Sequence, residues 1–328
     1  MKPAAVGLAA AVGLGAAVAV VVGMNLADDT GTDATSDLPT GDPTADARSG
    51  DAGNDPTAGS LPDCPALDPP AVAAAGPVVV PESAGAVPAA YTVEVIDRTP
   101  HDEMAFTQGL IHAGGLIYEG TGLYGESLIR LIEADTGDVL AEETVDESLF
   151  GEGVAGHGGR LYQLTWREEE VLVRDRCSLA ETGRMGYEGE GWGLTGDGSV
   201  LWRSDGTDTL SVHDPDDFVV TSTVDVHDRG RPVTRLNELE LVDGQILANV
   251  WQTPWIARID PRSGEVTGWI DGSPLVEEIG SNDPEAVLNG IAVDGGSGRL
   301  WLTGKRWPTI FEVRVVPAAD LPPPGGLG

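Results

Sequence analysis

The chain has 328 residues, with 53 Asp and Glu against 19 Lys and Arg, and a formal net charge of −34 at pH 7. So acidic a surface repels phosphate backbones and anionic lipid headgroups, which excludes nucleic-acid binding. Hydrophobic residues make up 41%, enough for a core, and 45 glycines indicate many turns and short strands rather than long helices.

Residues 4–24 form an uncharged apolar run that follows Lys2. The run is long enough to cross a bilayer and is longer than the usual core of a signal peptide. Because only a poor small-residue cleavage site follows, residues 1–27 are predicted to be an uncleaved membrane anchor rather than a cleaved signal peptide. Either interpretation makes the rest of the chain extracytoplasmic, either anchored by this segment or secreted, with no other membrane contact.

Residues 28–90 are rich in Asp, Thr, Gly, Pro, Ser and Ala and poor in large apolar side chains. Such a composition cannot bury enough surface to fold, which predicts a disordered tether. The two cysteines, Cys64 and Cys177, permit one disulfide in an exported protein, and two free thiols are the alternative.

The region 91–318 repeats one pattern five times: a small polar entry, an apolar strand, a Gly turn and two further strands. The entries begin at Gln108, Glu152, Trp192, Glu238 and Asn289. Short strands with Gly turns at a period of roughly 40–50 residues indicate an all-β fold, a five-bladed β-propeller. The fifth repeat has only three strands, so residues 92–99 are predicted to add its outer strand. The N-terminal strand then completes the last blade and leaves no free sheet edge.

In a propeller the first strand of each blade lines the central channel, so the five entry residues are expected to converge there. Trp166, Trp251 and Lys305 stand at or just past the ends of second strands and are expected to lean over the same mouth. Packing or channel filling would explain any one of these side chains. A glutamate, amides, tryptophans and the only lysine of the predicted domain at one end instead indicate a small-ligand site.

All five histidines fall outside this column, which argues against a histidine-ligated metal. No cofactor is expected. The one metal that we consider is a structural calcium ion in the channel, for which Glu152, Asn237, Glu238 and Asn289 offer oxygen ligands.

Nine motifs carry a family resemblance: FTQGL (106–110), FGEG (150–153), YQLTW (162–166), GWGLT (191–195), SDG (204–206), LNELE (236–240), ANVW (248–251), LNGIA (288–292) and TGKRWP (303–308). Together and in this order they resemble the propeller-type glutaminyl cyclases of plants and bacteria, over residues 91–316. The resemblance implies a glutaminyl-peptide cyclotransferase, an acyltransferase. It closes the N-terminal Gln of peptides or proteins into pyroglutamate and releases ammonia.

The catalytic roles follow from the resemblance together with the chemistry. Glu152 matches the glutamate of the family's FGEG motif and is predicted to act as general base and then acid, with a pKa raised by its aromatic surroundings. Gln108 and Asn237 are predicted to position the amide or donate to the oxyanion, and Lys305 to supply positive charge there. Alternatively, Glu152 binds a cation on the axis or the substrate ammonium.

The predicted substrate-binding residues are Trp166, Trp192, Trp251, Phe106, Glu238 and Asn289. For Phe106, core packing is the alternative. Two other functions stay open: a calcium-dependent propeller hydrolase or lactonase, and a non-catalytic propeller that binds peptides. A monomer is the default expectation.

Overall fold

The computed structural model describes residues 64–67, 87–318 and 324. The chain divides into two units, residues 1–57 and residues 58–328, and every described residue belongs to the second. The predicted anchor at residues 1–27 and most of the predicted tether at 28–90 lie outside the described residues. Within the described ranges, no helix has the length and apolar character needed to cross a membrane.

The all-β prediction is confirmed, because the described part of the chain consists of strands and one short helix. The strands are β1 (Ala89–Pro100), β2 (Thr107–Ala113), β3 (Leu116–Thr121), β4 (Leu128–Glu133), β5 (Val139–Thr144), β6 (Gly151–His157), β7 (Arg160–Thr165), β8 (Glu170–Asp175), β9 (Glu181–Gly186), β10 (Leu194–Gly196), β11 (Leu201–Arg203), β12 (Thr209–His213), β13 (Val220–Asp225), β14 (His227–Asp228), β15 (Arg231–Pro232), β16 (Leu236–Val242), β17 (Gln245–Val250), β18 (Trp255–Ile259), β19 (Val266–Asp271), β20 (Leu288–Val293), β21 (Leu300–Gly304) and β22 (Thr309–Pro317). The helix is α1 (Ser273–Ile279).

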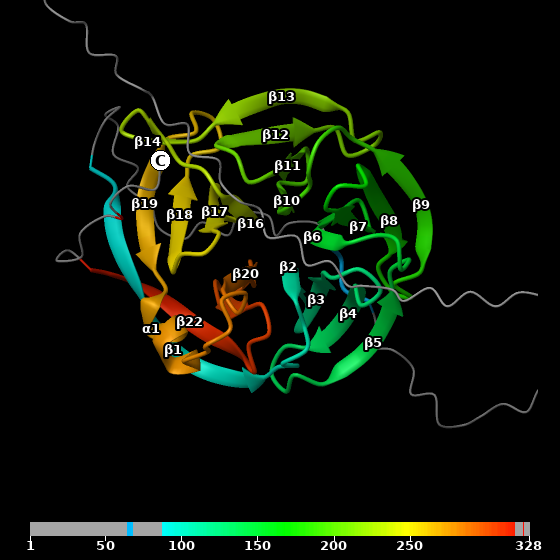
Figure 1. The fold of residues 1–328 in the computed structure, drawn as a ribbon, viewed down its shortest axis with the longest axis horizontal. Coiled ribbons are helices and arrows are strands. Elements are labelled where there is room, and N and C mark those ends of the chain that lie inside the picture. Colours follow the sequence, from blue (N-terminus) through cyan, green and yellow to red (C-terminus); the bar gives the residue numbers. More distant parts are fainter. Residues whose placement is uncertain (1–63, 68–86, 319–323, 325–328) are drawn as a thin grey trace, which may run out of the picture. The chain divides into compact units, whose positions relative to one another are not determined.

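Most strands belong to four-stranded antiparallel groups. Three are separate sheets with the orders β2-β3-β4-β5, β6-β7-β8-β9 and β10-β11-β12-β13. An eight-stranded sheet has the order β16-β17-β18-β19-β1-β22-β21-β20, so it is two such groups joined where β19 meets β1. Figure 1 shows β2, β6, β10, β16 and β20 nearest the centre and the last strands of each group at the periphery.

The inner strands contact one another in a closed order, β2 to β6, β6 to β10, β10 to β16, β16 to β20 and β20 to β2. Glycine makes this close approach possible, because a Cβ on Gly153 would lie 2.6 Å from the carbonyl oxygen of Trp192 on the neighbouring group. The amide of Gly153 donates to that same carbonyl at 2.8 Å. The five inner strands therefore lie close to one another at their first residues, in a closed cycle of contacts.

Apolar side chains fill the spaces between neighbouring groups. One cluster joins β12 to β16–β19 around Trp269, and another joins β17–β19 to β20–β22 around Trp307. Further clusters lie between the remaining neighbours, one of them around Trp301. These three tryptophans are almost fully buried, so they pack between sheets and are not available to a ligand.

Strand β1 closes the last group. As predicted for residues 92–99, it pairs antiparallel with β22, from Tyr91 opposite Pro317 to Pro100 opposite Thr309. A second pairing was not anticipated: the start of β1 runs parallel to β19, from Ala89 opposite Gly268 onward. Strand β1 therefore pairs with β22 of its own strand group and with β19 of the neighbouring group.

The hairpin β14–β15 and helix α1 interrupt the repeat and were not predicted. The helix begins after Gly272 with a proline in its first turn and ends at Gly280, whose φ of 59° is left-handed. At seven residues it is too short to give a clear 3.6-residue pattern, which explains why the sequence did not indicate it.

The two cysteines, whose state the sequence left open, form a disulfide with Cα atoms 5.4 Å apart. The short segment that follows Cys64 packs against the inner strands, since Leu67 is buried and contacts the backbone at Gly156. The disulfide therefore attaches the segment that precedes β1 to the turn between β8 and β9.

Candidate active site

A cavity of about 330 Å³ lies where the inner strands begin. Its walls are Phe106, Gln108, Leu123, Phe150, Glu152, Trp166, Trp192, Asn237, Trp251, Glu285, Lys305 and Arg306. Eight of the ten sequence-predicted site residues are in this set. The cavity volume is at the lower end of the range of small-ligand sites, about 300–1,000 Å³.

Irregular pairing sets which side chains enter the cavity. In β2, β6, β16 and β20 the register shifts at the residues Gln108, Glu152, Asn237 and Asn289, each of which follows the first paired residue of its strand. Such a bulge re-aims a side chain and is common beside binding sites. The sequence alignment of the fourth repeat is therefore wrong by one residue: Asn237 belongs to this column, and Glu238 matches the glycines.

Glu238 and Asn289 lie deeper than the cavity and do not line it. Glu238 is 1% exposed and accepts a hydrogen bond from the amide of Leu110 at 3.3 Å. Asn289 is fully buried and donates its side-chain amide to the carbonyl of Thr107 at 2.9 Å. Both side chains therefore link one inner strand to another, and this structural role needs no contact with a substrate.

Glu152 is the buried carboxyl group of the cavity wall. Its Oε1 accepts a hydrogen bond from Nε2 of Gln108 at 3.0 Å, and only 5% of the residue is exposed. Burial raises the pKa of Glu152 well above its ordinary value, Lys305 opposes this, and the nearby Glu190 and Glu168 add to it. A carboxyl group with a raised pKa can both take up and give back a proton near neutral pH.

Lys305 supplies a buried positive charge to the same wall. Its ammonium lies 4.6 Å from the centre of the Phe106 ring, and the residue is 5% exposed. Burial lowers the pKa of Lys305, while the carboxylates of Glu152 and Glu285 act against that shift. Phe106 therefore contacts the cation and the cavity at once, in addition to packing edge-on against Phe150 with ring centres 6.3 Å apart.

The aromatic walls form two pairs. Trp192 packs edge-on against Trp251 with ring centres 5.6 Å apart, and Trp166 lies 5.5 Å from Phe150. Glycine makes room for one of these rings, because a Cβ on Gly206 would lie 2.7 Å from the Trp192 ring and its φ is 81°. The aromatic cup predicted from the sequence is thus present.

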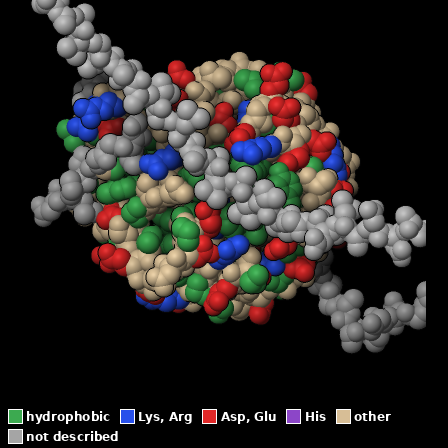
Figure 2. Space-filling view, viewed as in Figure 1, with side chains coloured by type: hydrophobic (Ala, Val, Ile, Leu, Met, Phe, Trp, Pro, Cys, Tyr) green, Lys and Arg blue, Asp and Glu red, His purple; other side chains and the backbone are tan. Residues whose placement is uncertain are grey.

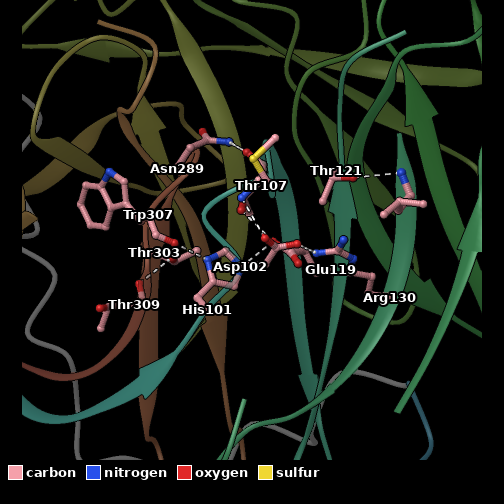
Figure 3. A network of polar contacts seen from close by, with 12 residues as sticks. His101, Asp102, Thr107, Glu119, Thr121, Arg130, Asn289, Thr303, Trp307 and Thr309 are labelled. Atoms are coloured by element: carbon pink, nitrogen blue, oxygen red, sulfur yellow. Dashed lines mark hydrogen bonds and ion pairs between the residues drawn. The ribbon is translucent and has the colours of Figure 1, made fainter. Parts of the chain in front are cut away.

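A buried polar network holds the loop between β1 and β2 (Figure 3). The last residue of this loop is Phe106. His101 contacts the carbonyl of Trp307 through Nδ1 at 2.8 Å and the carboxylate of Glu119 through Nε2 at 2.9 Å. Thr107 donates to the same carboxylate oxygen at 2.7 Å. The loop at residues 101–106, the first residue of β2, the β21–β22 turn and β3 are therefore linked.

A second and larger cavity, about 490 Å³, lies between the two halves of the eight-stranded sheet. It is lined by side chains such as Tyr91, Arg258 and Arg314 and contains none of the residues predicted for catalysis. Its larger volume alone would favour this second cavity as the functional site. The smaller cavity is the better candidate because its walls combine a buried carboxyl group, a buried ammonium and a cup of tryptophans.

Residues 71–315 match the family model described as glutamine cyclotransferase. The chain belongs to the glutamine cyclotransferase family. It is 41% identical over 231 residues to the glutaminyl-peptide cyclotransferase of Arabidopsis thaliana, covering 69% of this chain and 72% of the relative. The crystal structure of Myxococcus xanthus glutaminyl cyclase matches with a TM-score of 0.67 and 40% identity, over 70% of this chain and 99% of that one.

Sequence reasoning missed four lining residues of this family member: Leu123, Phe150, Glu285 and Arg306. Phe150 stood in the quoted FGEG motif, two residues before Glu152, and that spacing was a usable signal. The other three lie outside the inner strands, so the repeat pattern does not distinguish them. Aligning LNELE (236–240) with LNGIA (288–292) by their shared Leu-Asn pair would have given the correct register of Asn237.

The sequence predicts at most one metal ion, a structural calcium ion in the channel. In the described ranges, no three His, Cys, Asp or Glu side chains come close enough together to hold a metal ion. The structural calcium ion stays a prediction, with Glu152, Asn237, Glu238 and Asn289 as the oxygen donors predicted for it.

Proposed function

We propose that this chain is a glutaminyl-peptide cyclotransferase that converts the N-terminal glutamine of peptides or proteins to pyroglutamate and releases ammonia. Family membership and the names of both relatives support it. The observation that carries the proposal is the buried Glu152, which shares one cavity with Lys305 and three tryptophans.

The reaction needs a proton carrier and a cavity that holds the substrate in its reactive conformation. It needs no nucleophile from the enzyme. The α-amino nitrogen of the glutamine forms a bond to its own γ-carbonyl carbon, and the bond to the amide nitrogen breaks. One proton must leave the attacking nitrogen and one must reach the departing ammonia. Glu152 performs both transfers, because its raised pKa allows uptake and return near neutral pH.

Charge that develops on the γ-oxygen needs donors on the cavity wall. Gln108 and Asn237 offer side-chain amides there, and Lys305 offers an ammonium in a site that excludes most water. Gln108 also orients Glu152 through their hydrogen bond. The three tryptophans and Phe106 hold the glutaminyl chain curled, so that amine and carbonyl carbon meet.

We also propose that the strand groups are the blades of a five-bladed β-propeller over residues 91–318, with β1 completing the last blade. The closed order of contacts among the five inner strands supports this. The anchor at residues 1–27, the tether at residues 28–90, the extracytoplasmic location and the monomeric state stay predictions.

The direct test is ammonia release from the dipeptide Gln-Ala by the purified protein. We expect turnover of Gln-Ala, and none of N-acetyl-Gln-Ala, because acetylation removes the nucleophilic amine. Mass spectrometry should show a product 17 Da lighter than the substrate, the mass of the ammonia that leaves. Absence of ammonia from Gln-Ala under all tested conditions would reject the proposed activity.

The reaction as proposed requires no metal-activated water, since nucleophile and electrophile belong to the same substrate. Activity should therefore survive incubation with a chelator. A complete loss of activity that added calcium restores would instead favour the calcium-dependent hydrolase.

A further inference from the structure

One carboxylate holds two of the tryptophans that form the cavity wall. Oε2 of Glu190 accepts a hydrogen bond from the indole nitrogen of Trp166 at 2.9 Å and from that of Trp192 at 3.0 Å. Trp166 directly follows β7 and Trp192 precedes β10, so the two rings come from different sheets. Glu190 itself does not line the cavity, and its carboxylate bridges the two rings.

The bridging carboxylate is itself fixed from several sides. Its Oε1 accepts from Nε of Arg167 at 3.0 Å, and the guanidinium of Arg167 lies 3.6 Å from the centre of the Trp166 ring. The carbonyl of Glu190 accepts from Arg203, and the next amide, that of Gly191, donates to the carbonyl of Trp166 at 2.9 Å. The side chain of Glu190 therefore binds the indole of Trp166, and the neighbouring backbone amide binds the main chain of the same residue.

We propose that Glu190 is a positioning residue, which sets the separation and orientation of Trp166 and Trp192 so that the space between them fits a curled glutaminyl side chain. The inference rests on the proposed function, because it explains how the same cavity holds its substrate. Two indole donors on a single oxygen are a stricter geometric constraint than ring packing alone, since packed rings can slide while a shared acceptor fixes both nitrogens.

Glu190 also acts on Glu152 through its charge. The charged groups that face Glu152 are Lys305, which lowers the pKa of Glu152, and Glu190 and Glu168, which raise it. Glu190 stays ionised: burial raises its pKa, but hydrogen bonds from Trp192, Trp166 and Arg167 lower it by more. Removal of the Glu190 charge should lower the pKa of Glu152. The acid side of the kcat/KM profile, where activity rises as Glu152 loses its proton, should therefore move to lower pH, whether or not the substitution disturbs the rings.

Two variants separate positioning from charge. Glu190→Ala removes the acceptor of both indoles, and we expect kcat/KM for Gln-Ala to fall by about 10- to 100-fold. Glu190→Gln also removes the charge but keeps an oxygen for the two indoles, so we expect a loss of no more than about threefold. The proposal is overturned if Glu190→Ala stays within threefold of the wild type, or if both variants lose activity equally.

A matched control is Glu181→Ala on β9. The side chain of Glu181 is 35% exposed and pairs with Arg184, whereas that of Glu190 is 36% exposed and pairs with Arg167. Loss of this control carboxylate should leave kcat/KM unchanged, which excludes a general effect of removing an ion pair.

A measurement without substrate keeps the inference separate from the proposed function. The indole N–H signals of Trp166 and Trp192 in a ¹⁵N NMR spectrum, assigned with Trp166→Phe and Trp192→Phe, should shift in Glu190→Ala and remain close to wild type in Glu190→Gln. If the wild type releases no ammonia, the proposed function fails while these signals still test Glu190. If the wild type is active and both signals stay in place in Glu190→Ala, only the inference fails.

Discussion

Glu152 and Lys305 illustrate how burial and charge oppose each other within one cavity. Burial raises the pKa of the carboxyl group and lowers that of the ammonium, so it disfavours the charged form of each. Each group also stabilises the charge of the other, which restrains both shifts. Both pKa values consequently move toward neutral pH, where a group that exchanges protons is most effective.

Replacing Glu152 by Gln removes the proton carrier while keeping a side chain of the same shape. We expect kcat for Gln-Ala to fall by about 10²- to 10⁴-fold. The melting temperature should stay equal to that of the wild type or rise, because a buried carboxyl group with a raised pKa is replaced by a neutral amide. Unchanged turnover in an intact Glu152→Gln protein would show that another group carries the proton.

Replacing Lys305 by Met removes the cation that lowers the pKa of Glu152. The acid side of the kcat/KM profile, where activity rises as Glu152 loses its proton, should therefore move to higher pH. The alkaline side, where activity falls as Lys305 loses its proton, should disappear. Arg314→Met, at an exposed ion pair with Glu94 outside the cavity, is the control that should leave the profile in place.

Individual side chains were predictable from the sequence where their type or their place in a repeat singled them out. Lys305 and the three tryptophans are of rare types, whereas Glu152 begins a repeat and stands in the FGEG motif; all of them line the cavity. Glu190 was not predictable, since it is one of many acidic residues and its importance depends on two indole nitrogens from different sheets.

At the scale of elements, bulges decide how the inner strands meet the cavity. A repeat pattern counts residues evenly, whereas a bulge inserts one residue without extending the strand. The bulge recurs in β2, β6, β16 and β20, so it does not displace one repeat against another. The alignment of Glu238 with Gln108 failed because Glu238 stands where the other repeats have a glycine, which removed the residue that marks the register. The strands themselves, including the pairing of residues 92–99 with β22, followed from apolar runs and turn residues. The parallel pairing of β1 with β19 has no local signal, because it depends on how two groups meet.

The loop between β1 and β2 depends on a protonated histidine. Both partners of the His101 ring, the Trp307 carbonyl and the Glu119 carboxylate, are acceptors, so both ring nitrogens must carry a proton. Burial lowers the pKa of His101, but Glu119 and the Trp307 carbonyl raise it by more, so the net shift is upward. The resulting stability is complete below the unfolded pKa, about 6.5, and is lost as pH rises through the folded pKa.

His101→Leu leaves the buried Glu119 without the cation that it contacts, and we expect the free energy of unfolding at pH 6 to fall by about 3–5 kcal/mol. Urea unfolding from pH 6 to 9 measures it, and the difference between wild type and variant should shrink toward high pH. Adding Glu119→Gln to the variant should recover part of the loss, because it removes the uncompensated charge. A difference that grows with pH would contradict the assignment.

For the whole molecule, charge and covalent linkage act in opposite directions. The formal net charge is −34, and Figure 2 shows acidic side chains spread over one face of the molecule rather than gathered in one patch. Such charge keeps a protein soluble and works against its compact state. The disulfide between Cys64 and Cys177 compensates, since it joins residues 113 positions apart in sequence.

Replacing both cysteines by Ser should lower the free energy of unfolding by about 2–5 kcal/mol, chiefly because the unfolded chain gains freedom. Thermal unfolding without reductant measures the effect. Wild-type protein in dithiothreitol should match the variant, and the ammonia assay should show little change at 25 °C because the bond lies outside the cavity. Equal melting temperatures for oxidised wild type and variant would refute this.

Since β22 must pair with β1, the last group of strands is complete only when the chain has been synthesised through residue 317. A product that stops before Thr309 leaves one flank of β1 exposed, with a row of unsatisfied amides and carbonyls that invites another chain to pair. Truncation from the C-terminal side should therefore yield aggregates rather than smaller active enzymes, and proteolytic trimming is tolerated only beyond that strand.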